Sequence, residues 1–351
     1  MRVLYFGTYE RGYPRNAQVI SCLRGAGVDV VERHVSVWDG HEHKFSAGLG
    51  AALRLARAET SLLRRLGGDF DAVVVGYPGH LDLPAAKRIA RGRPVVFNPL
   101  VSLSDTLVSD RGRFAPDSSA AKILRATDRA AFRTADLVVA DTAAQAAFFE
   151  DLGARRAEVC FVGAEERLFT PAWRQPDEFT CLFVGKLIPL HGLQTILEAA
   201  RRAPQLRFRV VGSGQLQALL DDRPANVEWR AWVEYEQLPD ELRTCGCALG
   251  IFGTSPKARR VIPNKVFQAL ACGAPVVTAD TPAARELLTG EDNALLVPPG
   301  DPDALVAALR RLAAEPELTR GIAARGLSTY RERASEAILG ERWRALIAGL
   351  L

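Results

Sequence analysis

The chain has 351 residues, of which 48% are hydrophobic and 25% charged, and its formal net charge at pH 7 is +4. This length is typical of two domains, and this composition excludes a disordered chain. The small net charge predicts no nucleic-acid partner.

No targeting or membrane-spanning segment is predicted. The opening residues MRVLYFG are too short and too quickly polar for a signal peptide, and no run of about 18 uncharged apolar residues predicts a transmembrane helix. Six cysteines lie mostly in apolar runs, which favours reduced, buried thiols and a cytoplasmic protein. Cys245 and Cys247 have no second Cys or His pair nearby, so we interpret them as core residues rather than metal ligands.

Short apolar runs alternate with helical segments rich in Ala, Leu and Arg. This alternation is typical of βαβ units and predicts an α/β fold of doubly wound, Rossmann-like layers on parallel sheets. In the first half the predicted strands are Val3–Gly7, Ala72–Gly76, Val95–Asn98, Leu137–Asp141 and Glu158–Gly163. In the second half they are Cys181–Gly185, Phe208–Gly212, Val227–Ala231, Ala248–Phe252, Val276–Ala279 and Ala294–Val297.

These strands are too many for one such sheet, so two domains are expected, at residues 1–168 and 169–333. The polar stretch Ala164–Glu178, which contains two prolines, is the expected linker. The tail Ala334–Leu351 is expected to form an amphipathic helix. Its apolar face is formed by Ile338, Trp343, Leu346 and Ile347.

Two glycine-containing loops follow predicted strands of the second half. The strand Cys181–Val184 ends in Gly185 and Lys186, and a helix is expected to begin near Gly192. Glycine lets a ligand approach the backbone, and a helix N-terminus attracts anions. The turn Gly212-Ser213-Gly214 repeats the arrangement before another expected helix, although it lacks the third glycine of a dinucleotide fingerprint. Ordinary strand-to-helix turns would explain both loops equally well.

The strongest candidate for an anion site is the segment around residues 248–279. A strand leads into a loop carrying Lys257, Arg259 and Arg260, and the next helix is expected to start with Asn264 as its N-cap. Lys265 falls in the first turn of that helix, which is expected to end at Gly273. A helix N-terminus with a lysine and a basic loop concentrates positive charge.

Five segments occur in the order VGKLIPLHGL, VVGSGQ, PNKVFQALACGAPVV, PAAREL and NALLVPPGDPDAL. Together they resemble family 4 of the retaining GT-B glycosyltransferases. PVVFNP, TADLVVADT and VGAEERLFTP resemble that family more loosely. The resemblance implies a GT-B fold of two facing Rossmann-like domains, with a nucleotide-diphosphate sugar bound mainly by the C-terminal one. It also implies a final helix, residues 334–351, that crosses back to the first domain.

The resemblance assigns site residues by position. Lys186 and Lys265 are the catalytic cations that stabilise the departing diphosphate. The implied donor-binding residues are Gly185, His191, Gly212, Ser213, Gly214, Asn264, Gln268 and Glu286. Three positions depart from the family. His191 stands where a lysine is usual, Arg260 where the first glutamate of the Glu-x7-Glu motif is usual, and Gln268 where its second, ribose-binding glutamate is usual. Gln268→Glu is therefore expected to be tolerated or to improve donor affinity.

The first half offers weaker candidates. Arg15 and Asn16 follow the first strand and could contact acceptor or phosphate, or could simply begin a helix. The family often has a catalytic histidine after the strand that matches Val95–Phe97, but the stretch Asn98–Asp105 contains none. His41 and His43 lack zinc spacing and are interpreted as a solvated loop. The arginine-rich helix expected at Leu53–Leu66 could touch the inner face of a membrane peripherally, although a core-packed helix explains it better.

The expected function is therefore retaining glycosyl transfer from a nucleotide-diphosphate sugar to a glycan, a lipid-linked acceptor or a small molecule. No Asp-x-Asp pair follows a strand, so no metal and no cofactor are expected. A nucleotide-sugar epimerase of the same fold and a non-catalytic sugar-nucleotide-binding module remain alternatives. A dehydrogenase would need a glycine fingerprint after the first strand, which the sequence lacks.

Overall fold

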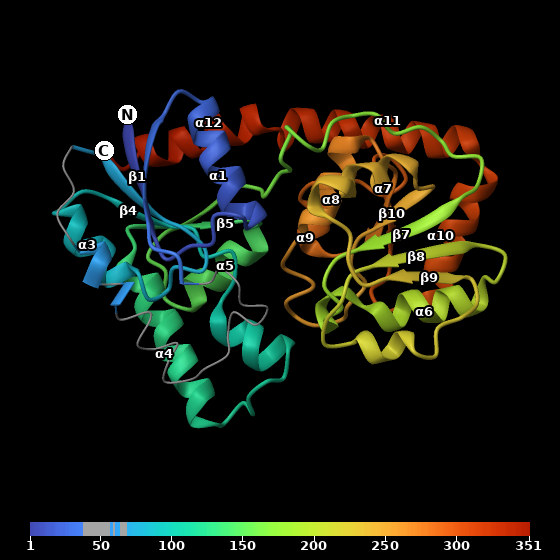
Figure 1. Ribbon diagram of the computed structural model, residues 1–351, viewed down its shortest axis with the longest axis horizontal. Coiled ribbons are helices and arrows are strands. Elements are labelled where there is room, and N and C mark those ends of the chain that lie inside the picture. Colours follow the sequence, from blue (N-terminus) through green and yellow to red (C-terminus); the bar gives the residue numbers. More distant parts are fainter. Residues whose placement is uncertain (38–56, 59, 64–68) are drawn as a thin grey trace. The chain divides into compact units, whose positions relative to one another are not determined.

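The computed structural model describes residues 1–37, 57–58, 60–63 and 69–351. This part of the chain forms two compact units, one of Met1–Phe161 with Glu336–Leu351 and one of Val162–Ser335 (Figure 1). In the described part each unit contains a six-stranded, wholly parallel sheet with helices between the strands. The predicted α/β class of two Rossmann-like layers is confirmed.

The sheet of the first unit has the strand order β2-β1-β3-β4-β5-β6. Its strands are β1 (Arg2–Gly7), β2 (Asp29–His34), β3 (Ala72–Val75), β4 (Val95–Phe97), β5 (Leu137–Ala140) and β6 (Ala157–Val159). The described helices of this unit are α1 (Pro14–Gly25), α3 (Leu83–Ala90), the π-helix η1 (Asp105–Asp110), α4 (Ser119–Thr134), α5 (Ala143–Asp151) and α12 (Glu336–Ala348).

The sheet of the second unit has the order β12-β11-β10-β7-β8-β9. Its strands are β7 (Thr180–Val184), β8 (Arg207–Val211), β9 (Val227–Arg230), β10 (Cys247–Leu249), β11 (Val276–Ala279) and β12 (Leu295–Val297). Its α-helices are α6 (Leu193–Arg202), α7 (Leu238–Thr244), α8 (Asn264–Cys272), α9 (Pro282–Arg285), α10 (Pro302–Ala314) and α11 (Pro316–Arg333). Three 3-10 turns complete it, η2 (Pro189–His191), η3 (Gln217–Leu220) and η4 (Tyr235–Gln237).

Strand β2 is the one described strand that the sequence did not predict. It is an edge strand of sequence DVVERH, and apart from Val30 its residues are exposed or only partly buried. A strand with one partner carries charged side chains that a strand buried on both faces cannot, so it lacks the continuous apolar run used to find the others.

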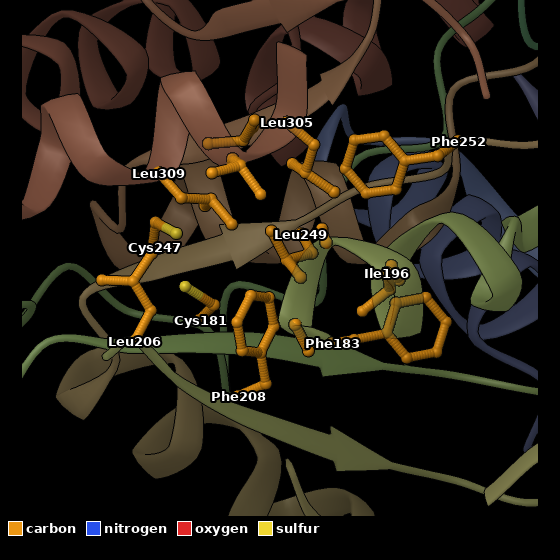
Figure 2. Packing of buried hydrophobic residues seen from close by; sticks show 14 of the residues in the cluster. Cys181, Phe183, Ile196, Leu206, Phe208, Cys247, Leu249, Phe252, Leu305 and Leu309 are labelled. Atoms are coloured by element: carbon orange, nitrogen blue, oxygen red, sulfur yellow. The ribbon is translucent and has the colours of Figure 1, made fainter. Parts of the chain in front are cut away.

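The hydrophobic core of the second unit fills the space between its sheet and helices α6 and α10. Figure 2 shows Cys181 and Phe183 of β7 beside Phe208 of β8, facing Ile196 and Leu309 from the two helices. All five are at most 1% exposed. These side chains anchor the strands whose carboxyl ends carry the candidate site.

Helix α12 belongs to the first unit and packs on α1. Trp343, Leu346 and Ile347 are buried in the same cluster as Val19 and Leu23 of α1. A methyl group on Gly340 would lie 2.4 Å from the carbonyl oxygen of Cys22, so the two helices approach closely. The expected apolar face is correct except at Ile338, which is 45% exposed and does not join the buried cluster.

The stretch expected to be a linker is instead fastened to the second unit, which begins at Val162. The indole Nε1 of Trp173 donates to the carbonyl oxygen of Cys245, and Arg243 donates to the backbone and side chain of Thr170. Its prolines indicate irregular backbone here, not a free tether.

All six cysteines are free and buried, as expected. Within the described residues, no helix has the length and apolar character needed to cross a membrane.

Candidate functional site

Two loops at the carboxyl edge of the second sheet are joined by backbone hydrogen bonds. The Gly185 amide donates to Val211 O and the Leu187 amide to Ser213 O, both at 2.9 Å. Lys186 and Ser213 are exposed on these loops. The structure therefore brings together the loops that follow β7 and β8, which the sequence singled out separately.

Glycine is required where these loops meet. A methyl group on Gly212, whose φ is +140°, would lie 2.0 Å from Gly185 O. One on Gly214, at φ +149°, would lie 2.9 Å from Leu187 O. The turn leads into the short 3-10 turn η3 rather than the expected helix, so no long helix N-terminus faces the site here.

His191 is held against the loop after β7. Its Nδ1 lies 2.5 Å from Lys186 O, and this contact makes Nδ1 the protonated ring nitrogen. The ring meets Phe183 edge to face at a centroid distance of 5.6 Å. Gly192, with φ +70°, is the N-cap of α6, so the predicted start of that helix is correct.

Helix α8 begins one residue earlier than predicted. Asn264 is its first residue, and the N-cap is Pro263, whose ψ of 150° is extended. Asn264 therefore does not cap the helix, because the proline already fixes the backbone at that position. The predicted end is correct, since Gly273 takes φ +78° as the C-cap.

Lys265 is buried in the first turn of α8. Its Nζ lies 3.6 Å from the centroid of the Phe183 ring, and a methyl group on Gly185 would be only 3.0 Å from it. The residue is 8% exposed, and Nζ has no hydrogen-bond partner within the described part of the chain. Burial holds the pKa of this lysine well below its usual value. The Lys265 amino group thus lies beside the glycine loop with its hydrogen-bond donors unused.

Gln268 lies one helical turn beyond Lys265 and begins a chain of polar contacts. Its Nε2 lies 3.3 Å from Tyr235 Oη, which lies 3.1 Å from Glu165 Oε1. Arg167 donates to the other carboxylate oxygen of Glu165 at 2.9 Å. Phe169 meets the Tyr235 ring edge to face at 5.7 Å. Gln268 and Glu165 are only 7% and 6% exposed.

The remaining candidates of the second unit lie farther along the chain. Glu286 follows α9 and is partly buried, and its amide donates to Ala283 O. The Ala283 amide in turn donates to Arg259 O, which joins the basic loop to α9. Lys257 in that loop is 5% exposed, so it is not a mobile surface cation.

Arg15 and Asn16 are structural residues of the first unit. Arg15 is 1% exposed and donates to Asn98 Oδ1, Phe161 O and Cys160 O. The Asn16 amide bonds Tyr5 and the backbone of Glu10 and Tyr77. These bonds engage both side chains with protein groups, so the helix-start interpretation fits better than ligand contact.

His80, to which the sequence analysis gave no role, contacts the carboxylate that binds the stretch where a histidine was sought. Its Nε2 lies 3.4 Å from Asp128 Oδ1, and Asp128 accepts bonds from the side chain of Ser102 and from the backbone of Leu103 and Ser104. The imidazole is 1% exposed, and burial lowers its pKa. His80 therefore lies against the buried carboxylate of Asp128, which in turn binds the loop after β4.

Two predicted features, His41 with His43 and most of the basic helix Leu53–Leu66, lie outside the described residues. Within the described residues, no group of three or more His, Cys, Asp or Glu side chains is arranged to hold a metal ion.

Family models match both halves of the chain. Residues 178–315 match the model described as glycosyl transferases group 1, and residues 2–165 match that of a glycosyl transferase 4-like domain. The chain belongs to the group 1 glycosyltransferases. The match over residues 178–315 includes every donor-site candidate of the second unit. Glu165 is the last residue of the match over residues 2–165, and Arg167 and Phe169 follow it directly.

Two curated glycosyltransferases are similar to it. The lipopolysaccharide core biosynthesis glycosyltransferase LpsE of Rhizobium meliloti is 24% identical over 228 residues, which is 62% of this chain. LpsD of the same organism is 25% identical over 192 residues, or 51% of this chain. The matched regions span 65% and 51% of those two proteins.

Solved glycosyltransferase structures share the fold. Anabaena HepE in complex with UDP-glucose has a TM-score of 0.71 at 18% identity, with 100% of both chains covered. Sucrose-phosphate synthase from Thermosynechococcus elongatus has a TM-score of 0.75 at 17% identity, with 99% of both covered. The predicted GT-B fold class is thereby confirmed.

Proposed function

We propose that this group 1 glycosyltransferase transfers a sugar, with retention at the anomeric carbon, from a nucleoside-diphosphate sugar bound at the carboxyl edge of its second sheet. The observation that carries this proposal is Lys265, a buried ammonium group without a hydrogen-bond partner among the described residues. Burying such a group is unfavourable unless something compensates it, and a diphosphate beside the Gly185 loop would do so.

The chemistry follows from where charge develops. Breaking the bond between the sugar and the diphosphate leaves negative charge on the departing phosphate oxygens. Lys265 and the first amides of α8 would stabilise that charge, with the exposed Lys186 as a second cation. These groups would interact more strongly with the transition state than with the bound donor, because the negative charge is larger there. They would therefore lower the barrier as well as bind the donor.

Donor contacts are proposed for the rest of the site. The glycines at 185, 212 and 214 would let the diphosphate approach the backbone. Further contacts would come from Ser213 in the loop after β8, His191 in η2, Asn264 at the start of α8 and Glu286 at the end of α9. Gln268 would bind the ribose hydroxyls, since an amide oxygen accepts hydrogen bonds from a diol. Uridine diphosphate is the first nucleotide to test, because HepE was crystallised with UDP-glucose.

The proposed acceptor is a carbohydrate, because the two curated relatives act in lipopolysaccharide core biosynthesis. No metal is proposed, since cationic side chains would carry out the charge stabilisation that a divalent ion otherwise provides. We propose a cytoplasmic location, with peripheral contact at the inner membrane face as a secondary hypothesis.

A thermal-shift panel of nucleoside diphosphates and their sugars tests donor binding. A ligand at a hundredfold excess over its Kd stabilises the folded state by about 2.7 kcal/mol, which is readily seen as a shift in Tm. No shift with any nucleotide would contradict the proposal.

Product analysis with the preferred donor and oligosaccharide acceptors, in excess EDTA, then tests the reaction. Transfer with retained anomeric configuration is expected. Isomerised sugar nucleotide without transfer would indicate an epimerase, and binding without any turnover would indicate a binding module. Loss of transfer in EDTA, restored by magnesium or manganese, would contradict the metal-independent mechanism.

A further inference from the structure

The direction of the hydrogen bonds from Gln268 to Glu165 is fixed by charge. Glu165 accepts from Arg167, and as a carboxylate it can only accept. The Tyr235 phenol has one proton, and burial and the nearby carboxylate raise its pKa above the ordinary value, so it keeps that proton. The proton must therefore be donated to Glu165.

This leaves only lone pairs on Tyr235 Oη for the third member of the chain. The Gln268 group that lies 3.3 Å from Oη must be a donor, which is its NH2. The amide oxygen Oε1 then faces away from Tyr235. The charge on Glu165 thus decides which end of the Gln268 amide is turned toward the phenol and which is turned away.

We propose that Glu165 and Tyr235 are positioning residues that fix the orientation of the Gln268 amide, so that its oxygen is turned toward the ligand as an acceptor. The ligand half of this inference rests on the proposed function, in which Gln268 meets a ribose. An amide is ambiguous because it both donates and accepts. Once one N–H of the amide donates to Tyr235, the amide oxygen is turned away from the phenol. It can then accept from a hydroxyl as a carboxylate oxygen would, without adding negative charge near a diphosphate.

The sequence-based expectation for Gln268→Glu is reversed by this geometry. A carboxylate at position 268 would face a phenol oxygen that has already given its proton to Glu165. Two carboxylates would then compete for one proton across a single phenol, in a buried setting where such competition is costly. The substitution should weaken the site. Adding Glu165→Gln should restore it, because an amide at position 165 can donate to Tyr235 and leave the phenol proton for the carboxylate introduced at position 268.

The test is a double-mutant cycle of the full chain with four proteins, the wild type, Gln268→Glu, Glu165→Gln and the double variant. Each is measured for free energy of unfolding and for its affinity for UDP and 2′,3′-dideoxy-UDP. Gln237→Glu, alone and with Glu165→Gln, is the control for unfolding, since it makes the same chemical change on an exposed residue of η4. Tyr235→Phe removes the link between the two ends.

We expect Gln268→Glu to lose roughly tenfold in UDP affinity and the double variant to regain at least about half of that loss on a logarithmic scale. Wild type should prefer UDP over the dideoxy analogue by about three- to tenfold, the range of one neutral hydrogen bond. Tyr235→Phe should reduce this preference, because the amide is then free to turn. The Gln237 pair should be additive.

Additive losses of stability in the Glu165–Gln268 cycle would overturn the positioning role, whatever the ligand. Coupled stability with equal affinity for the two nucleotides would overturn the assignment of Oε1 to the ribose. Coupled stability with no UDP binding would overturn UDP as the ligand while the link between Glu165 and Gln268 stands. The failure of this inference and that of the proposed function are therefore distinguishable.

Discussion

The Nζ of Lys265 lies 3.6 Å from the centroid of the Phe183 ring and has no hydrogen-bond partner in the described structure. A cation over an aromatic face gains about 0.5–2 kcal/mol, which is less than a desolvated ammonium group loses. The charged form of Lys265 is therefore unfavourable in the unliganded protein. Binding of an anion, or removal of the charge, should relieve this cost.

Lys265→Met should stabilise the unliganded protein and weaken nucleotide binding. A buried donor without a partner destabilises the folded state by roughly 1–3 kcal/mol. Methionine removes that donor while keeping much of the side-chain volume. Denaturant unfolding and UDP titration of the same preparation check both effects. Lys186→Met is the matched control. Because Lys186 is exposed, its removal should leave stability nearly unchanged. A less stable Lys265→Met variant that still binds UDP normally would contradict the prediction.

The lowered pKa of Lys265 predicts pH-dependent stability. Below its folded-state pKa the lysine is charged in both folded and unfolded chains, so the full unfavourable cost of burying the charge is present. As pH rises from that value toward the unfolded value of about 10.4, the folded protein loses the proton first and its stability increases. The stability of the wild type should therefore rise relative to that of Lys265→Met through that window. Parallel stability profiles for the two proteins would contradict the shift.

Binding of UDP should be coupled to proton uptake. A diphosphate beside Lys265 favours its charged form, so the bound pKa exceeds the free one, and affinity falls as pH rises through the bound value. Calorimetric titrations in buffers of different ionisation enthalpy measure the proton number directly. The number should be near zero in Lys265→Met. A His191→Gln variant separates the contribution of the imidazole, whose Cε1 also lies near Gly185.

Gly212→Ala should distort the joined loops. Its methyl group would lie 2.0 Å from Gly185 O at a φ of +140°, so backbone strain of roughly 1–3 kcal/mol is expected, together with a large loss of UDP affinity. Gly290→Ala is the control in the same unit, because its nearest neighbour would be 3.7 Å away. Thermal unfolding and UDP titration compare the two. Similar Tm values for both variants would show that the loops tolerate a side chain.

Arg15→Met should destabilise the protein without changing nucleotide affinity. Its removal breaks the hydrogen bonds to Asn98 and to the backbone carbonyls of Cys160 and Phe161, a loss of roughly 2–4 kcal/mol. Arg11→Met, at an exposed arginine of the same unit, should cost much less. Unfolding is followed in denaturant, and UDP affinity is measured where both variants are fully folded. Normal stability with a slower transfer reaction would return Arg15 to the acceptor side.

How far the sequence predicted the structure depended on whether a signal was local. Gly192 and Gly273 mark helix ends because their own backbone angles require glycine, and both were found. The role of Arg15 could not be found, because its partners Asn98 and Phe161 are remote in sequence and their proximity depends on the folded sheet. The link from Gln268 to Glu165 is hidden for the same reason, since its two ends are 103 positions apart in the sequence.

The pairing of α1 with α12 has a consequence for how the protein is made. Residues 162–335 form a complete unit interrupting another one, whose last helix is encoded after them. As the chain emerges from the ribosome, the second unit can fold before the first is complete. Val19, Cys22 and Leu23 of α1 stay uncovered until Trp343 and Leu346 of α12 have been synthesised. The first half of the chain must therefore remain unfinished, with an apolar helix face open to solvent or chaperones, until the second half has folded.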